Sequence, residues 1–147
     1  MRKRILAFDM GKKRIGVALS DELCITAQGQ QTIEAKSFND VVEQIKLLLN
    51  KYNIDRIVIG LPKNMDGTLG PKSEEIIKFE KMLRNYIDVP VVLWDERLTT
   101  RMAEQSMLEG DLSRAKRKRR IDMISAQLIL QSYLDSEQCK NESDKTK

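Results

Sequence analysis

The apolar residues near the start of this chain fall into short, compact runs. Arg4–Phe8 and Ile15–Ser20 are rich in Ile, Val and Leu, which predicts two strands. The segment between them contains Gly11 and is short enough to form a hairpin. A third strand is expected around Thr26–Ile33. The first part of the chain therefore predicts three strands joined as a meander.

Further along, segments with apolar residues at helical spacing alternate with short segments that are apolar throughout. Ser37 can cap a helix that continues to about Tyr52. A second helix is expected to open at Ser73, where two glutamates follow the serine. Arg56–Gly60 and Val91–Trp94 are short apolar runs of the kind that forms buried parallel strands.

Two more helices complete the expected order of elements, one over about residues 99–109 and one over Ile121–Leu134. Strands in a meander followed by alternating helices and strands predict an α/β fold, a five-stranded mixed sheet with helices on both faces. No linker divides the chain, so we expect a single domain over residues 1–137. The polar tail, residues 138–147, is expected to be disordered.

Positive charge is concentrated in one stretch of the chain. The 147 residues carry 26 Lys and Arg against 22 Asp and Glu, a net charge of +4. Arg114–Arg120 holds six of these cations, and without it 20 cations face 22 acids. Basic runs are often solvated loops, but six cations within seven residues favour an anion-binding function.

The composition excludes several classes of site. The chain has no histidine, which excludes histidine-dependent catalysis and histidine-ligated zinc. Cys24 and Cys139 lie far apart, and no secretory signal is recognisable, so we expect reduced cysteines in the cytoplasm. No apolar stretch is long enough to span a bilayer, and no membrane association is expected.

Three carboxylates lie at the ends of elements that can meet at one edge of the sheet. Asp9 ends the first strand, Glu96 follows the last strand, and Asp122 lies at the start of the final helix. Ligands of open α/β sheets collect beyond the carboxyl ends of the parallel strands. Each acid alone has an ordinary explanation: Asp9 can bond turn amides, Glu96 can pair with Arg97, and Asp122 can favour its helix dipole.

Taken together, the three carboxylates indicate a metal site. Grouped carboxylates repel one another unless a cation lies between them. Mg²⁺ and Mn²⁺ prefer oxygen ligands, so an all-carboxylate set suits them better than zinc. Two such ions about 4 Å apart can support phosphodiester hydrolysis by activating water and stabilising the leaving oxygen. Lys12–Arg14 and Arg114–Arg120 can hold the flanking phosphates, so the sequence predicts a two-metal nuclease.

Three polar or aromatic residues near this edge are interpreted as structural. Trp94 is flanked by residues of a buried strand and is expected in the core. Asp95 should point to the opposite face from Glu96 if the strand continues through both. Asp66, which Gly67 follows, is expected in a turn.

Four ordered blocks of this chain resemble the YqgF family, also called RuvX. They are LAFDMGKKRIGVALSD, GLPKNMDGTLGP, VPVVLWDERLTT and KRKRRIDMISAQLILQSYL, and they extend from residue 4 to about residue 135. The resemblance implies a ribonuclease H-like fold related to RuvC-type Holliday junction resolvases. It also implies a function in 5′-end maturation of precursor 16S rRNA, since bacterial members are described as pre-16S rRNA nucleases and formerly as junction resolvases.

The same resemblance assigns the family's acidic positions to Asp9, Glu96 and Asp122. It places the loop Lys63–Thr68 and residues beside Glu96 in the substrate groove. Two departures from the family pattern are Ala7, where glycine is usual, and Met123, where lysine is frequent. The residues expected to bind nucleic acid are Lys12, Lys13, Arg14, Lys63, Asn64, Arg97, Thr99, Thr100, Arg114, Lys116, Arg117, Lys118, Arg119 and Arg120.

Three alternatives to an rRNA nuclease remain open from the sequence. A Holliday junction resolvase acts on branched DNA and needs two active sites, hence a homodimer, whereas a monomer suffices for rRNA trimming. A nucleic-acid-binding factor without catalysis fits the basic stretch equally well, although three carboxylates would repel its ligand. The Asp-x-Gly hairpin also resembles the phosphate loop of actin-like kinases, which need two such domains.

Overall fold

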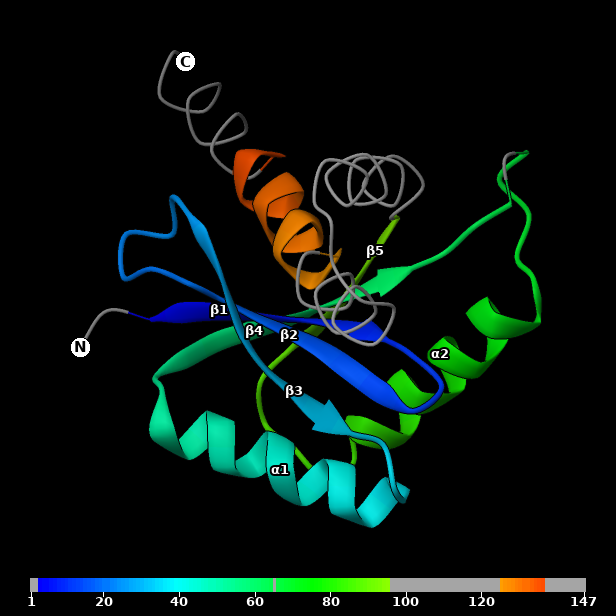
Figure 1. The fold of residues 1–147 in the computed structure, drawn as a ribbon, viewed down its shortest axis with the longest axis horizontal. Helices are drawn as coiled ribbons and strands as arrows, with labels where there is room; N and C mark the ends of the chain where they lie inside the picture. Colours follow the sequence, from blue (N-terminus) through cyan, green and yellow to red (C-terminus); the bar gives the residue numbers. More distant parts are fainter. Residues whose placement is uncertain (1–2, 65, 96–124, 137–147) are drawn as a thin grey trace, which may run out of the picture.

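The computed structural model describes residues 3–64, 66–95 and 125–136 of the chain. Within these residues the fold consists of one sheet and three helices (Figure 1). The strands are β1 (Arg4–Met10), β2 (Arg14–Ser20), β3 (Ala27–Glu34), β4 (Ile54–Leu61) and β5 (Val91–Asp95). The helices are α1 (Phe38–Lys51), α2 (Pro71–Leu83) and a helix over residues 125–136.

The five strands form a single mixed sheet in the order β3-β2-β1-β4-β5. β1 pairs antiparallel with β2, and β2 pairs antiparallel with β3, as a meander requires. β4 then pairs parallel with β1, and β5 pairs parallel with β4. The predicted five-stranded mixed sheet is confirmed, and β1 is its central strand.

Alternate residues of the strands bury their side chains on opposite faces of the sheet. Leu6 and Phe8 of β1 join the core beneath α1 and α2, whereas Ile5 and Ala7 pack on the other face. The second face is covered by the 125–136 helix, which lies on the opposite side of the sheet from α1 and α2 in Figure 1. The predicted covering of both faces by helices is therefore confirmed.

The first residues of α1 were predicted correctly, and those of α2 were not. Ser37 caps α1 as predicted, and its Oγ accepts a hydrogen bond from the Asp40 amide at 3.2 Å. Ser73 does not cap α2, because the helix begins earlier, at Pro71, with Gly70 as its N-cap. Proline suits the first helical position because it lacks an N–H and has a fixed φ. The Ser73 hydroxyl instead donates to the carbonyl of Pro62.

Aromatic packing and hydrogen bonds fix the 125–136 helix to the sheet. The rings of Trp94 and Tyr133 meet edge to face, with centroids 5.3 Å apart. Trp94 Nε1 donates to Ser132 Oγ at 3.3 Å, so Trp94 is part of the core as predicted. Arg56 Nη1 donates to the Tyr133 hydroxyl at 2.7 Å. This hydrogen bond raises the pKa of Arg56, and the nearby Asp55 carboxylate adds to the effect. Burial acts in the opposite direction but is outweighed.

Several expected segments lie outside the described residues. They are the helix expected over about residues 99–109, the basic stretch Arg114–Arg120, the first residues of the Ile121–Leu134 helix, and the tail 138–147. The remainder of the last helix is confirmed by the helix over residues 125–136. Within the described ranges, no helix has both the length and the apolar character needed to cross a membrane.

Replacing Tyr133 with phenylalanine tests how firmly the 125–136 helix is attached. Tyr133→Phe keeps the ring against Trp94 and removes the hydroxyl that Arg56 donates to. We expect the free energy of unfolding, measured in urea, to fall by about 1–2 kcal/mol, because hydrogen bonds to charged groups are stronger than average. Tyr86→Phe is the control, since Tyr86 is half-exposed. An equal loss in both variants would contradict this role.

Candidate active site

Asp9 lies within the central strand and not beyond it, because β1 continues to Met10. Its partner on β2 is Gly16. On the β4 side, Phe8 pairs with Ile59, so the next position of that strand is Gly60. The residues directly opposite the half-buried Asp9 on the two neighbouring strands are therefore both glycines.

The alternation of β1 assigns Asp9 to a definite face of the sheet. Ile5 and Ala7 belong to the core under the 125–136 helix, and Asp9 is the next residue with the same parity. The carboxyl ends of β4 and β5 reach the same edge, where Gly60 pairs with Trp94. Asp95, one position after Trp94, falls on the opposite face from Asp9, which supports a structural role for Asp95.

The described residues contain one of the three predicted metal ligands, Asp9. Glu96 and Asp122 lie outside the described residues, as do the predicted nucleic-acid-binding residues Arg97, Thr99, Thr100, Arg114, Lys116, Arg117, Lys118, Arg119 and Arg120. Among residues 3–64, 66–95 and 125–136, no three Asp, Glu or Cys side chains gather as a potential metal site. The grouping of the three acids therefore stays a prediction.

The loop after β4 is closed by its own polar side chains. Asn64 Nδ2 donates to Thr68 Oγ1 at 2.9 Å, and the Asn64 amide donates to the Thr68 carbonyl at 2.9 Å. Asp66 accepts from the amide and the hydroxyl of Thr68, at 3.0 and 2.7 Å, and Gly67 has a φ of 89°. Asp66 is a turn residue as predicted. The sequence predicts Asn64 in a loop and in contact with substrate, and the structure shows that its side chain also closes this turn, as the Asn-x-Asp-Gly pattern indicates.

The turn between β1 and β2 places cations at the same edge as Asp9. The Gly11 amide donates to the Arg14 carbonyl at 3.0 Å and closes the turn. The Ala35 amide donates to the Lys13 carbonyl at 2.9 Å, which fixes the turn to the end of β3. Lys12 and Lys13 are exposed, and Arg14 is half-buried. The three residues predicted to bind phosphate therefore belong to the turn that follows the strand carrying Asp9.

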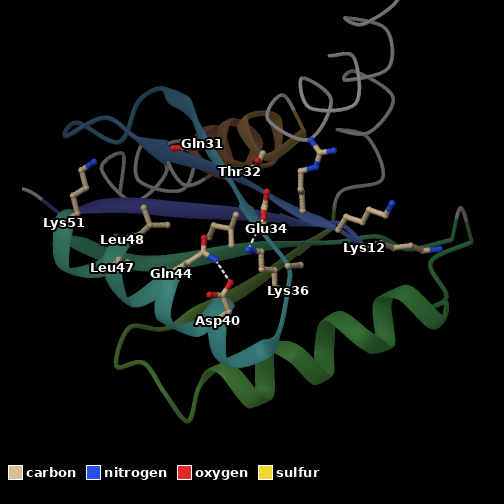
Figure 2. A pocket seen from close by; sticks show the side chains of 14 residues that line it. Lys12, Gln31, Thr32, Glu34, Lys36, Asp40, Gln44, Leu47, Leu48 and Lys51 are labelled. Carbon is tan, nitrogen blue, oxygen red and sulfur yellow. Dashed lines mark hydrogen bonds and ion pairs between the residues drawn. The ribbon is translucent and has the colours of Figure 1, made fainter. Parts of the chain in front are cut away.

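A cavity of about 1160 Å³ opens beside this turn, between β3 and α1 (Figure 2). We call it the β3–α1 groove. Two of its cations, Lys36 and Lys51, are absent from the sequence-based predictions, because each is an isolated lysine in an exposed segment. The groove is lined by Lys12, Lys13, Arg14, Gln31, Thr32, Ile33, Glu34, Ala35, Lys36, Asp40, Gln44, Leu47, Leu48 and Lys51.

Sequence comparisons agree with the resemblance over nearly the whole chain. A family model described as RuvX, Holliday junction resolvase, matches residues 3–136. A Clostridium kluyveri protein named "Putative pre-16S rRNA nuclease" is 54% identical over 132 residues, which cover 90% of this chain and 96% of that protein. A protein of the same name from Caldanaerobacter subterraneus subsp. tengcongensis is 52% identical over 135 residues, with coverage of 91% and 97%.

Two solved Holliday junction resolvases have a similar fold. The RuvC of T. thermophilus in complex with a Holliday junction substrate gives a TM-score of 0.58 at 12% identity, covering 93% of this chain and 96% of that chain. The Fowlpox virus resolvase in complex with Holliday junction DNA gives 0.56 at 15% identity, with coverage of 90% and 97%. At these identities the likeness concerns the fold, and it confirms the ribonuclease H-like architecture.

Gly11→Ala tests whether the tight turn beside Asp9 depends on this glycine. A Cβ at position 11 would lie well inside contact distance of the Arg14 carbonyl oxygen, a backbone atom that cannot turn away as a side chain can. We expect the free energy of unfolding to fall by about 1–3 kcal/mol in urea denaturation. Lys12→Ala, at an exposed position of the same turn, should change it by less than about 0.5 kcal/mol. Unchanged stability of Gly11→Ala would mean that the turn relaxes without cost.

Proposed function

The chain belongs to the RuvX family, and on this premise we propose that it is a divalent-metal-dependent nuclease of precursor 16S rRNA. In this function it hydrolyses phosphodiester bonds during maturation of the 5′ end, in the cytoplasm. The observation that carries the proposal is the placement of Asp9 on the central strand, at the edge where three parallel strands end. The relatives named for this activity match almost the full length of the chain.

The donor atoms available to a metal at this edge are consistent with Mg²⁺ or Mn²⁺. The proposed ligands Asp9, Glu96 and Asp122 are all carboxylates, and the chain contains no histidine. Hard divalent cations favour such oxygen ligands. Bound there, they neutralise the carboxylates and supply the Lewis acidity that phosphodiester hydrolysis needs. Metal dependence is general to nucleases of this family.

The protein's own contribution is to hold the backbone of Asp9 in a fixed position. Asp9 is part of a strand paired on both sides, so its backbone position is fixed by two ladders of hydrogen bonds. Its direct neighbours across the sheet, Gly16 and Gly60, have no side chains. We assign Lys12 and Lys13, on the adjacent turn, to the phosphates on either side of the cleaved bond.

A Holliday junction resolvase is the second candidate, favoured by the description of the family model and by the fold of the two solved resolvases. We rank it lower for two reasons. The relatives with more than 50% identity carry the rRNA nuclease name, whereas the solved resolvases share only 12–15% identity. Resolution of a junction also requires two active sites and therefore a homodimer, while rRNA trimming can be performed by a monomer.

Asp9→Asn is the direct test of the proposed chemistry. The substitution preserves size and removes the charge, so we expect cleavage of a labelled precursor 16S rRNA fragment to slow at least about a thousandfold, equivalent to about 4 kcal/mol. Binding of the same RNA should persist, because a negative charge near the phosphates has been removed. The assay compares cleavage on gels with Mg²⁺, with Mn²⁺ and with EDTA.

Asp88→Asn is the matched control, because Asp88 is an exposed residue that precedes β5, at the opposite end of that strand from the candidate site. Normal cleavage by Asp9→Asn would overturn the proposed mechanism. Cleavage of a four-way DNA junction but not of the RNA would move the assignment to the resolvase. Tight binding of both substrates without any cleavage would identify a binding factor.

A further inference from the structure

The β3–α1 groove carries an excess of positive charge and extends from the β1–β2 turn along α1. Its lining includes five cations, Lys12, Lys13, Arg14, Lys36 and Lys51, against two acids, Glu34 and Asp40. These residues come from the β1–β2 turn, the end of β3 and α1, which are separate in the sequence. The net charge of the lining is therefore +3, assembled by the fold.

The groove begins at the turn beside Asp9 and follows α1. In Figure 2, Lys12 and Lys51 lie at opposite ends of the groove, with Asp40 and Gln44 between them. α1 has 14 residues, so it is about 21 Å long. At about 3.4 Å per nucleotide, this length corresponds to about six nucleotides of a stacked strand.

Both acids of the groove are engaged within the protein. Glu34 Oε2 lies 3.7 Å from Lys36 Nζ, and the Asp40 carboxylate accepts a hydrogen bond from Gln44 Nε2 at 2.7 Å. The Lys36–Glu34 pair is well exposed, with side chains 73% and 69% accessible. Exposed pairs of this kind are weak, so Lys36 can turn towards an incoming anion at little cost.

We propose that the β3–α1 groove binds the phosphate backbone of the substrate strand that leaves the catalytic edge. The inference rests on the proposed nuclease function and extends it, because it assigns Lys36 and Lys51 to phosphates beyond those that flank the cleaved bond. Lys12, Lys13 and Arg14 connect the two regions, since they belong both to the turn beside Asp9 and to the groove.

An extended acidic peptide is the other polyanion that could enter the groove, and the geometry of β3 disfavours it. Such peptides bind by adding a strand to a regular sheet edge. β3 is an edge strand, but its register with β2 shifts between Ile15 and Val17, as in a β-bulge. Bulges and charged side chains at an edge hinder the pairing of a further strand. Phosphate contacts from lysines do not need a regular backbone edge.

The test compares two pairs of lysine substitutions that remove the same charge. Lys36→Gln/Lys51→Gln neutralises the groove. Lys46→Gln/Lys81→Gln is the control, because Lys46 lies on the same helix with its Nζ 6.0 Å from the Tyr86 ring centroid, and neither lysine lines the groove. The affinity for a 20-nucleotide single-stranded RNA is measured in EDTA between 50 and 200 mM KCl.

The groove variant is expected to bind RNA more weakly than the wild type. Its slope of log affinity against log salt should be less steep by about 1.4, since each lost contact to a single strand removes about 0.7. The control should keep the wild-type slope. Thermal unfolding of both variants checks that Lys51, at the end of α1, is not needed for folding. If the groove variant unfolds early, single substitutions of Lys36 and Lys46 replace the pairs, with an expected slope change of about 0.7.

Equal slopes in the groove variant and the control would overturn the proposal. Groove-dependent binding of polyglutamate, with RNA binding unaffected, would overturn it in favour of an acidic protein partner. The result is independent of catalysis, because no metal is present. RNA binding through the groove by a protein that does not cleave would contradict the proposed function alone, and cleavage with an unaltered slope would contradict the groove alone.

Discussion

The pairing of β1 on both of its edges is the constraint on which the other elements depend. β2 lies antiparallel on one side and β4 lies parallel on the other. Leu6, Ala7 and Phe8 have no exposed surface, because helices cover both faces of the sheet at this strand. A strand fixed by hydrogen bonds at both edges and by packing on both faces has one register. The residue at its end is therefore fixed as well.

That single register decides on which side of the sheet the carboxylate lies. A slip of one residue would move Asp9 to the face of α1 and α2 and would place Phe8 under the 125–136 helix. The same register places Gly16 beside Asp9 and aligns the ends of β1, β4 and β5. The chemistry proposed for this edge thus depends on core packing that takes no part in it.

The sequence allowed the strands, the capped helix α1 and the core position of Trp94 to be predicted, because each is determined by local periodicity or by one side chain near its own backbone. The start of α2 was misplaced, since Pro71 and Ser73 are both acceptable helix openings and only the packing chooses between them. The β3–α1 groove could not be predicted. Lys36 and Lys51 are far from Lys12 and Lys13 in the sequence, and only the pairing of β3 with β2 brings Lys36 close to the turn that holds Lys13.

The separation of charges by the sheet has a consequence for how a nucleic acid can be held. Phosphates are repelled by carboxylates and attracted by lysines, so a substrate positioned by cations alone would settle away from Asp9. In the proposed mode of binding the Gly11 turn opposes this outcome, because its residues Lys12 and Lys13 follow the strand that carries Asp9 and also line the groove. In the proposed mode of binding, a strand held along α1 crosses the turn, and its next phosphates reach the edge that carries Asp9. Binding energy gained in the groove would then be directed towards the proposed site of hydrolysis.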